Sequence, residues 1–443
     1  MLSLTWLFVL LFGLRAAGAL ILRPYDLVNR EYAGHSVPVL DFSPSYSLIN
    51  RRSYVAGIWT SFFNYSRSNR TFYWGGCIRS DDRTYIYTTT AVEGPWTRLA
   101  TLNECYYDAG LLIDEDDTIR VRSQQVYQAS FTFEGARFYK RNGAYYIFLI
   151  RLRDARFILK STSEPFGPYT LRSLLDRIAG PISNGGAPHQ GGLVDTQNGD
   201  WYYMSFIDAY PGGRVPALAP ITWDSSGWPV VSLVNGAWAP TGTDSFTGSA
   251  LGHEWEMNHN PDCSRWSVGN GLPLSTATVT YDLYSARNTL THRVLGPSST
   301  ATIILDYSDM RDGGRTGLAL LRSSSAWVGI ARDSGRCRVA ISGITMTSTW
   351  ATDGTGSYVG SSDLSSCTGR IWLRASADNR PQPAGVGRFS YSFDGDSFTP
   401  LGGTFTFKTD WQFFLGYRFG IFDYATSELG GSVTVSSFTV ATP

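Results

Sequence analysis

Apolar and polar residues alternate with a period of two through much of the second half of the chain, as they do in half-buried β-strands. The alternation is strict at residues 300–306, 336–341, 370–374, 389–393 and 432–436. Asp394 and Gly395 follow one of these segments, and an Asp-Gly pair between strands predicts a hairpin turn. Many short strands at regular spacing predict a β-sandwich that runs to the C-terminus.

A weaker internal repeat runs through the first half. Each copy has an aromatic-rich strand, a turn and a second strand that ends in a Gly-Pro-aromatic corner, at residues 71–96 and 143–169, and a third copy begins at residue 199. Such units cannot bury both faces alone, so they favour β-propeller blades packed side by side. An ordinary antiparallel sandwich with similar hairpins is the alternative.

The sequence between these halves becomes rich in Pro, Thr, Gly and Ser around residues 237–252, which predicts a linker. A length of 443 residues also agrees with two domains. We expect an all-β chain with a propeller over residues 20–245, a linker over 246–254 and a sandwich over 255–443. The one segment that could form a short helix is 171–178.

The charge balance excludes two classes of partner. Lys and Arg number 37, Asp and Glu number 37, and charged residues make up only 17% of the chain. No basic surface is therefore expected for nucleic acid or for an anionic membrane. Aromatic residues reach 14%, and their faces suit a neutral polysaccharide, although β-strands favour the same residues for packing alone.

Residues 1–19 resemble a secretory signal, with an apolar run of about ten residues and small residues before a cleavage site after Ala19. That run is too short to span a bilayer. Asn64 and Asn69 each begin a glycosylation sequon. These features predict a secreted, extracellular protein.

The five cysteines also suit an oxidising compartment. The preferred arrangement has two local bridges, Cys77–Cys105 and Cys337–Cys367, and leaves Cys263 free, although spacing alone does not determine the pairing.

Several stretches of the chain carry a more specific signal. In the first half they are residues 25–29, 34–38, 57–59, 105–114, 134–137, 188–192 and 206–229, and in the second half 274–278, 318–322 and 414–431. In this order they resemble glycoside hydrolase family 43, and most of all its members with a C-terminal concanavalin-A-like sandwich. The resemblance implies a five-bladed propeller before that sandwich, and inverting hydrolysis of a glycosidic bond by two opposed carboxyl groups.

The resemblance also implies the roles of two carboxyl groups. Glu134, in the motif Glu-Gly-Ala-Arg, matches the general acid of the family, and a surface glutamate is the alternative. Asp108 matches the aspartate that tunes and orients this acid, and a hydrogen-bonded structural aspartate is the alternative.

Three further residues match positions that bind substrate in the family. Arg214 resembles an arginine whose planar fork grips sugar hydroxyls or holds the acid, while a purely structural ion pair is the alternative. Trp59 resembles a tryptophan that stacks on sugar, and His189 resembles a histidine on the propeller axis that faces water or calcium in relatives. A core aromatic and a core histidine are the alternatives for these two. Arg214 and His189 are expected to converge with Glu134 and Asp108 at one end of the propeller axis.

No cofactor is expected to be required, and a structural calcium ion near His189 is the one candidate. The other histidines lack the spacing of metal ligands, and neither a Gly-x-Ser-x-Gly elbow nor a phosphate-binding loop is present. The protein is expected to be a monomer.

Two parts of the family pattern are missing from this sequence. The family places its catalytic base, an aspartate, ahead of the segment that matches residues 25–29, but residues 1–25 contain neither Asp nor Glu. A second block is missing between Thr118 and Gln125. We therefore expect a first blade without its inner strands, no carboxylate opposite Glu134, and impaired activity.

The predicted function is that of a glycosidase that releases arabinofuranosyl or xylosyl units from plant cell-wall arabinoxylan, and either specificity agrees with these residues. A non-catalytic pseudoenzyme that binds carbohydrate is the alternative.

Overall fold

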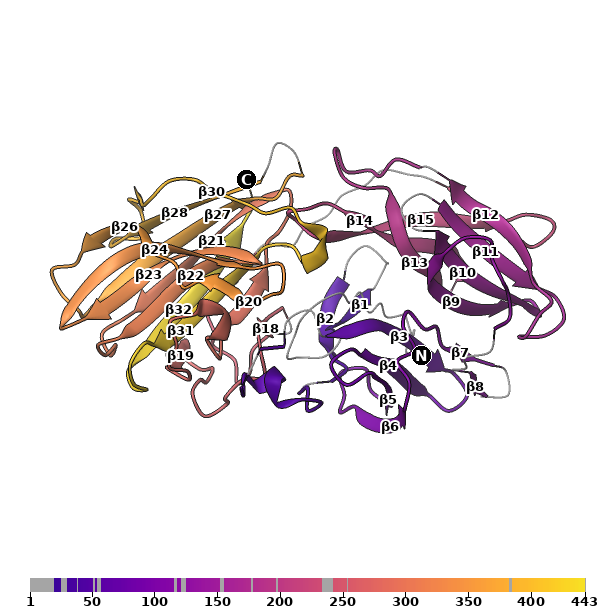
Figure 1. Ribbon diagram of the computed structural model, residues 1–443, viewed down its shortest axis with the longest axis horizontal. Coiled ribbons are helices and arrows are strands. Elements are labelled where there is room, and N and C mark those ends of the chain that lie inside the picture. The colour runs from indigo at the N-terminus through magenta and orange to yellow at the C-terminus, as the bar shows by residue number, and fades with distance from the viewer. Residues whose placement is uncertain are drawn as a thin grey trace.

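The computed structural model describes residues 20–24, 30–37, 39–50, 52–53, 57–114, 118–120, 125–151, 155–176, 178–196, 198–232, 242–252, 254–381 and 385–442. Figure 1 shows two β-rich domains side by side, the N-terminal one in indigo to magenta and the C-terminal one in orange to yellow. The described helical segments are three single 3₁₀ turns: η1 (Pro44–Ser47), η2 (Leu283–Ser285) and η3 (Trp411–Phe413). None of the described helices could cross a bilayer.

Three four-stranded antiparallel sheets form most of the N-terminal domain, and the strands of each follow one another in the chain. Their strands are β3 (Ile58–Ser66), β4 (Thr71–Ile78), β5 (Arg83–Thr89) and β6 (Thr97–Leu102); β9 (Phe133–Arg141), β10 (Ala144–Arg151), β11 (Ala155–Ser161) and β12 (Thr170–Asp176); and β13 (Pro188–Asp195), β14 (Trp201–Asp208), β15 (Arg214–Trp223) and β16 (Pro229–Val231). Each sheet is one blade of the predicted propeller. The segment 171–178, considered as a short helix, is instead mostly the outer strand β12.

Two further sheets in this domain have only two strands each among the described residues. β1 (Leu20–Pro24) pairs with β2 (Arg30–His35), and β7 (Leu112–Ile113) pairs with β8 (Ile119–Arg120). The first pair lies where the first blade is expected. The second lies on either side of Thr118, where the sequence lacks a block of the family pattern, and both sheets are small among the described residues.

The C-terminal domain is a sandwich of two eight-stranded sheets. In the first sheet β17, β32, β21, β27, β28 and β29 lie in that order, with β19 on β32 and β30 on β28. In the second sheet the order is β18, β20, β31, β22, β23, β24 and β25, with β26 on β24. The bounds are β17 (Gly242–Asp244), β18 (Glu256–Met257), β19 (Leu272–Ser275), β20 (Leu290–Arg293), β21 (Ser298–Asp306), β22 (Gly314–Leu321), β23 (Ser324–Asp333), β24 (Arg336–Met346), β25 (Thr352–Gly354), β26 (Tyr358–Asp363), β27 (Arg370–Asp378), β28 (Val386–Ser392), β29 (Thr399–Pro400), β30 (Phe405–Thr406), β31 (Arg418–Ala425) and β32 (Ser432–Ala441).

The core of the sandwich lies between these two sheets. Every second residue of β21 and β27 is buried, which is the alternation that predicted these strands. Phe246 and Trp255 are also buried in this core, and β17 already pairs with β32. The structure therefore places the segment 246–254, expected to be a linker, between parts of the sandwich itself.

The predicted disulfides Cys77–Cys105 and Cys337–Cys367 are both present, and Cys263 is free and exposed. Polar contacts also join the two domains. Arg52 of the N-terminal domain donates to the Asp282 carboxylate at 2.8 Å, and Asn260 of the sandwich exchanges two hydrogen bonds with the Leu40 backbone. The proposed signal at residues 1–19 lies outside the described residues.

Candidate active site

Asp108 connects three neighbouring segments of the propeller. It lies just before β7, is 3% exposed, and its backbone has a φ of 53°, a conformation that non-glycine residues adopt only with support. Its Oδ2 accepts hydrogen bonds of 3.1 Å from the backbone N–H of Gly135, on β9, and from the side-chain amide of Gln190, on β13. Asp108 is therefore held rigidly next to the residue that precedes Gly135.

That preceding residue is Glu134, which is half-buried on β9. Burial raises the pKa of the Glu134 carboxyl, the negative charge of Asp108 raises it further, and the positive charge of Arg214 lowers it. A carboxyl group with a raised pKa keeps its proton at higher pH, as a general acid must. The structure therefore places Asp108 beside Glu134, as the resemblance implied, and the two roles remain a prediction.

Arg214 stands at the start of β15, where its side chain is largely buried. Its Nε donates to Asp208 at 3.2 Å, and its guanidinium carbon lies 4.4 Å from the ring centre of Phe206. An ion pair therefore holds Arg214, as the structural alternative supposed, while its charge still acts on Glu134.

His189 lies in β13, with its ring 5.2 Å from that of Phe206. Burial, together with the charges of Arg156 and Arg214, lowers the pKa of His189 to about 4. The imidazole is therefore neutral near neutral pH. Its Nδ1 is buried and has no hydrogen-bond partner among the described residues.

The buried polar atoms near His189 show whether a calcium ion would fit there. Asp108 Oδ1 and Gln190 Oε1 are also buried without a partner among the described residues, and such oxygens suit calcium. Calcium, however, takes six to eight oxygen ligands. The positive charges of Arg156 and Arg214 act on the adjacent His189, and they disfavour a cation there. The described residues also contain no group of three His, Cys, Asp or Glu that could hold a metal. These residues do not fit a calcium site, and no step of the reaction is assigned to one.

An aromatic wall stands beside the charged groups. The ring of Trp59 lies 5.9 Å from that of Tyr107 and 5.5 Å from that of Phe414. Burial and the charges of Asp108 and Glu134 raise the pKa of Tyr107 to about 12, which places this phenol near both carboxyls. The structure thus brings Trp59 to the same site as Asp108, Glu134 and Arg214.

Phe414 reaches this wall from the sandwich domain, where it follows η3. The backbone of Leu415 pairs with that of Gly213, and Tyr417 N–H donates to the Pro211 carbonyl at 3.2 Å. Gly213 and Gly416 permit this approach, because a Cβ on Gly213 would lie 2.3 Å from the Gly416 nitrogen. The loop that carries Arg214 and the loop that carries Phe414 therefore pack against each other directly.

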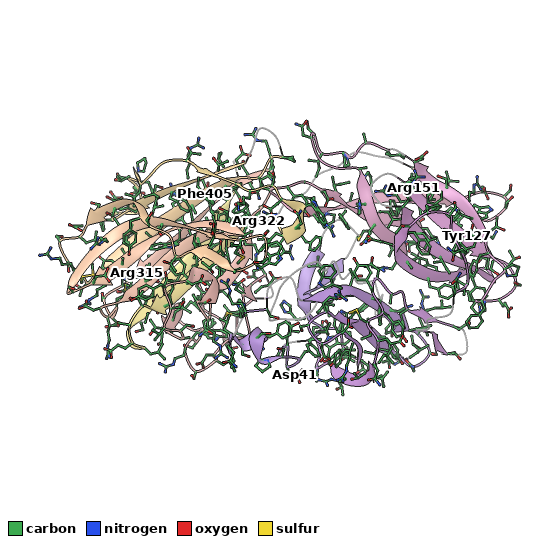
Figure 2. All side chains as sticks on the ribbon, in the orientation of Figure 1. Asp41, Tyr127, Arg151, Arg315, Arg322 and Phe405 are labelled. Atoms are coloured by element: carbon green, nitrogen blue, oxygen red, sulfur yellow. A yellow bond between two sulfur atoms is a disulfide. The ribbon has the colours of Figure 1, made fainter. Side chains whose placement is uncertain are left out.

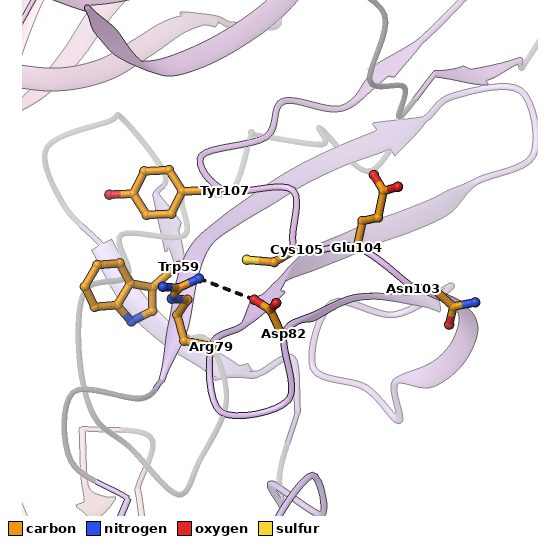
Figure 3. A pocket seen from close by; sticks show the side chains of 7 residues that line it. All are labelled: Trp59, Arg79, Asp82, Asn103, Glu104, Cys105 and Tyr107. Atoms are coloured by element: carbon orange, nitrogen blue, oxygen red, sulfur yellow. Dashed lines mark hydrogen bonds and ion pairs between the residues drawn. The ribbon is translucent and has the colours of Figure 1, made fainter.

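A pocket of about 480 Å³ opens beside Trp59 and Tyr107. Its remaining lining residues are Arg79, Asp82, Asn103, Glu104 and Cys105. Figure 3 shows the Trp59 and Tyr107 rings at one side of the pocket, the Arg79–Asp82 ion pair in the middle, and Glu104 and Asn103 farther from Trp59. Aromatic faces with a few polar groups are typical of small-molecule sites.

The sequence analysis expected no carboxylate opposite Glu134, and the charges that shift the pKa of Glu134 bear on this expectation. Within the described part of the chain, Asp108 is the only carboxylate that shifts the pKa of Glu134. Asp82 and Glu104 line the adjacent pocket, but neither contributes to the pKa shift of Glu134 or of Tyr107.

The sequence analysis named neither Tyr107 nor Phe414 as a site residue, nor Gln190, nor the remaining residues of the pocket. Tyr107 directly precedes Asp108, so its position in the motif was a usable signal. Phe414 opens a stretch that had been matched to the sandwich alone, and nothing in that stretch indicated the distant propeller.

A propeller, a fused sandwich and a carboxyl pair beside aromatic rings are the features of a glycosidase with an accessory β-sandwich. The model of the "Beta xylosidase C-terminal Concanavalin A-like domain" matches residues 243–441. A solved structure of a GH43 glycoside hydrolase, engineered to display both endo-xylanase and exo-arabinofuranosidase activity, is 38% identical, with a TM-score of 0.91 over 97% of this chain and 94% of that chain. This protein belongs to glycoside hydrolase family 43.

Two curated relatives show the same kinship. A beta-xylosidase of Formosa agariphila is 24% identical over 526 residues, covering 95% of this chain and 84% of the relative. A non-reducing end alpha-L-arabinofuranosidase of Bacteroides ovatus is 29% identical over 161 residues, or 30% of each chain. The alignment with the first relative is longer than this chain of 443 residues, so that relative contains residues with no counterpart here.

Proposed function

We propose that this protein hydrolyses arabinofuranosyl or xylosyl linkages of arabinoxylan by inversion, with Glu134 as the general acid. The observation that carries the proposal is the raised pKa of Glu134, held beside Asp108 and Arg214 against the ring of Tyr107. The relatives named beta-xylosidase and arabinofuranosidase support the choice of substrate.

In this proposal each group has one role. Glu134 protonates the leaving oxygen of the glycosidic bond, and the negative charge of Asp108 keeps the proton on Glu134 until the substrate is bound. Arg214 faces the same space and can donate to sugar hydroxyls. Trp59 and Phe414 offer ring faces against which a pentose can pack.

An inverting enzyme also needs a base about 6.5–9.5 Å from the acid, to activate water on the far side of the sugar. Among the described residues Asp108 is the one carboxylate whose charge raises the pKa of Glu134, and Asp108 already accepts two hydrogen bonds. We therefore propose that hydrolysis by this chain is slow, because loss of a general base costs roughly 10² to 10⁴ in rate.

The test is an assay of the wild-type chain and of Glu134→Gln on aryl arabinofuranoside, aryl xyloside and arabinoxylan. The proposal predicts slow turnover of at least one substrate, an inverted first product by NMR, and loss of turnover in the variant. Turnover that is equal in the two proteins would show that the activity does not come from this site.

The second candidate is a carbohydrate-binding protein without turnover. It is favoured by the two small sheets among the described residues, and by the aromatic wall of Trp59, Tyr107 and Phe414. Calorimetry with xylo-oligosaccharides separates the candidates. Binding without release of sugar over a long incubation supports this one, and turnover near the rates of related enzymes excludes it.

We also propose that the protein is secreted and acts as a monomer on neutral polysaccharide outside the cell. The two disulfides support an oxidising compartment. Detection of the chain in culture medium, and its mass in solution by light scattering, would test these two points.

A further inference from the structure

Arg322 is a wholly buried arginine that follows β22 in the sandwich domain. Its Nε donates to the Leu415 carbonyl at 2.9 Å, and its Nη1 donates to the Lys408 carbonyl at 3.3 Å and to the Asp410 carboxylate at 3.2 Å. Its Nη2 donates to the Asp410 carbonyl. One guanidinium thus binds the backbone at three points of the segment 408–415.

Aromatic rings surround the same guanidinium. Its central carbon lies 5.2 Å from the ring centre of Phe413, 5.8 Å from that of Tyr417 and 5.7 Å from that of Tyr210. Tyr210 belongs to the propeller, and its hydroxyl donates to the Phe414 carbonyl at 3.3 Å. Arg322 is therefore at the point where the two domains meet.

The segment that Arg322 binds has little regular structure of its own. Its described secondary structure is the single turn η3 and one isolated bridge from Leu415 to Gly213, and the segment belongs to none of the named strands. A buried carbonyl without a partner is costly, so the arginine replaces the sheet pairing that this segment lacks.

The same segment holds Phe414 in an unusual conformation. Its φ of 58° and ψ of −36° are rarely adopted by a phenylalanine. Such a residue needs support from its surroundings, and here the neighbouring carbonyl, that of Leu415, is bonded to Arg322. In this conformation the Phe414 ring contacts Trp59 and lies 4.7 Å from the Arg214 guanidinium carbon.

We propose that Arg322 is a positioning residue for the sugar site: it fixes the segment 408–415 so that Phe414 closes the wall formed with Trp59 and Arg214. The inference rests on the proposed function, because it takes Phe414 to be part of the sugar site. Arg322 itself does not touch the substrate. Its effect on binding and turnover should therefore pass through Phe414.

Arg315 provides a matched control. It lies near the other end of β22, about 20 Å away at the usual rise of a strand, and it pairs with Asp333 at 2.9 Å. Figure 2 labels both arginines and shows Arg322 toward the propeller and Arg315 on the far side of the sandwich. Replacement of either by Met removes a largely buried ion pair, but only one of the two is bonded to the Phe414 segment.

The first measurement is a double-mutant cycle of Arg322→Met and Phe414→Ala, read as kcat/KM on the aryl glycoside and as Kd for xylotriose. Each single variant should weaken both quantities on the order of tenfold or more, as misplaced binding groups do. The double variant should be no worse than Phe414→Ala alone, since the two residues act in series. Arg322→Lys should recover part of the loss, and Arg315→Met should change either quantity less than about twofold.

The second measurement needs neither turnover nor binding. Lys408 is exposed, and the Arg322 bond to its carbonyl protects the following peptide bond from trypsin. Arg322→Met should speed cleavage after Lys408 at least tenfold under native conditions, whereas Arg315→Met should not. Equal cleavage in both variants, or additive losses in the cycle, would overturn the proposal. If the wild type neither binds nor hydrolyses sugar, the proposed function fails, and the Lys408 assay still decides whether Arg322 holds the segment.

Discussion

The two domains differ in how their strands share a core. In the sandwich, both eight-stranded sheets contribute to one large hydrophobic cluster, and a second cluster, which includes Ala319 and Phe422, lies in the same domain. In the propeller, the described sheets are separate, two of them have only two strands, and the buried residues divide among four smaller clusters. Blades depend on their neighbours for burial, so a small blade weakens those beside it. The sandwich is therefore expected to be the more stable domain.

The polar groups of the candidate active site lie in the propeller, the domain whose hydrophobic core is divided. Asp108, His189 and Gln190 all have buried polar atoms without a partner among the described residues, and Asp108 and Gln190 have a positive φ. Such features are costly and are typical of sites shaped for function. The sandwich contributes Phe414 and the arginine that holds it. The comparison suggests a division in which the propeller carries the reacting groups and the sandwich supplies a stiff wall.

The largest expected effect tests whether the reaction depends on the propeller alone. Replacement of Glu134 by Gln removes the proton donor but keeps the shape of the side chain, so kcat should fall about 10² to 10⁴-fold with little change in thermal stability. Glu164→Gln, at an exposed turn of the same blade, is the control and should be neutral. Equal losses in the two variants would mean that the acid lies elsewhere.

The next prediction compares the stability of the propeller core with that of the sandwich core by replacing one buried isoleucine in each with alanine. Ile158 is 1% exposed in a propeller cluster, and Ile371 is 0% exposed in the sandwich cluster. Each change to Ala should cost about 2–5 kcal/mol of unfolding free energy. In calorimetry, the two domains should unfold in separate transitions. Ile158→Ala should lower the temperature of the first transition, and Ile371→Ala that of the second.

A single transition that both variants shift equally would contradict that separation. It would show that the interdomain contacts, such as Arg52 with Asp282 and Asn260 with Leu40, make the two domains unfold as one unit.

Much of the fold could be predicted from the sequence because the sandwich strands alternate strictly. The segments 300–306 and 370–374 lie within β21 and β27, which pair with each other in the first sheet. The segment 171–178 was harder, because its spacing of Leu and Ile also suits a helix. Its pairing with β11 decides the structure, and pairing depends on a neighbour rather than on the segment itself.

The site could be predicted only in part. Asp108, Glu134 and Arg214 stand in short motifs, and the structure brings their charges together. Phe414 is different, because it reaches the propeller only through the approach of Gly213 to Gly416 and the bonds of Arg322. A contact between distant segments leaves no period or spacing in the chain. The sequence therefore indicated the carboxyl groups and Trp59, but not the part of the wall that Phe414 supplies.

A smaller effect concerns pH. Glu134 must be protonated to act, so activity should be lost as pH rises through its pKa. Asp108→Asn removes a negative charge that raises this pKa but keeps an oxygen for Gly135 and Gln190, so the alkaline limb of the rate profile should move to lower pH. Asp200→Asn, at an exposed turn, should leave the profile unchanged. A shift to higher pH would contradict the role of Asp108.

The smallest expected effect distinguishes the two glycosylation sequons, at Asn64 and Asn69. It tests how the β7–β8 sheet is attached to the neighbouring blade. Asn64 lies in β3, and its side-chain amide donates to the Leu111 carbonyl at 3.0 Å, directly before β7. Asn69 lies in the exposed turn after β3. In a host that attaches N-linked glycans, mass spectrometry of tryptic peptides should find a glycan on Asn69 and little on Asn64.

The physical reason is that a glycan on Asn64 would be attached to the same amide nitrogen that donates to Leu111 between β3 and the β7–β8 sheet, and would crowd that contact. Asn64→Ala should therefore lower the stability of the propeller by about 1 kcal/mol, the usual net value of one hydrogen bond. Asn69→Ala should cost less, because the amide of Asn69 makes a longer bond of 3.3 Å, to the Tyr73 hydroxyl, from an exposed turn. Full glycan occupancy at Asn64 without loss of stability would show that the small blade does not need this bond. The two-stranded sheet would then be held by its apolar contacts alone, among them Leu111 packed with Phe62.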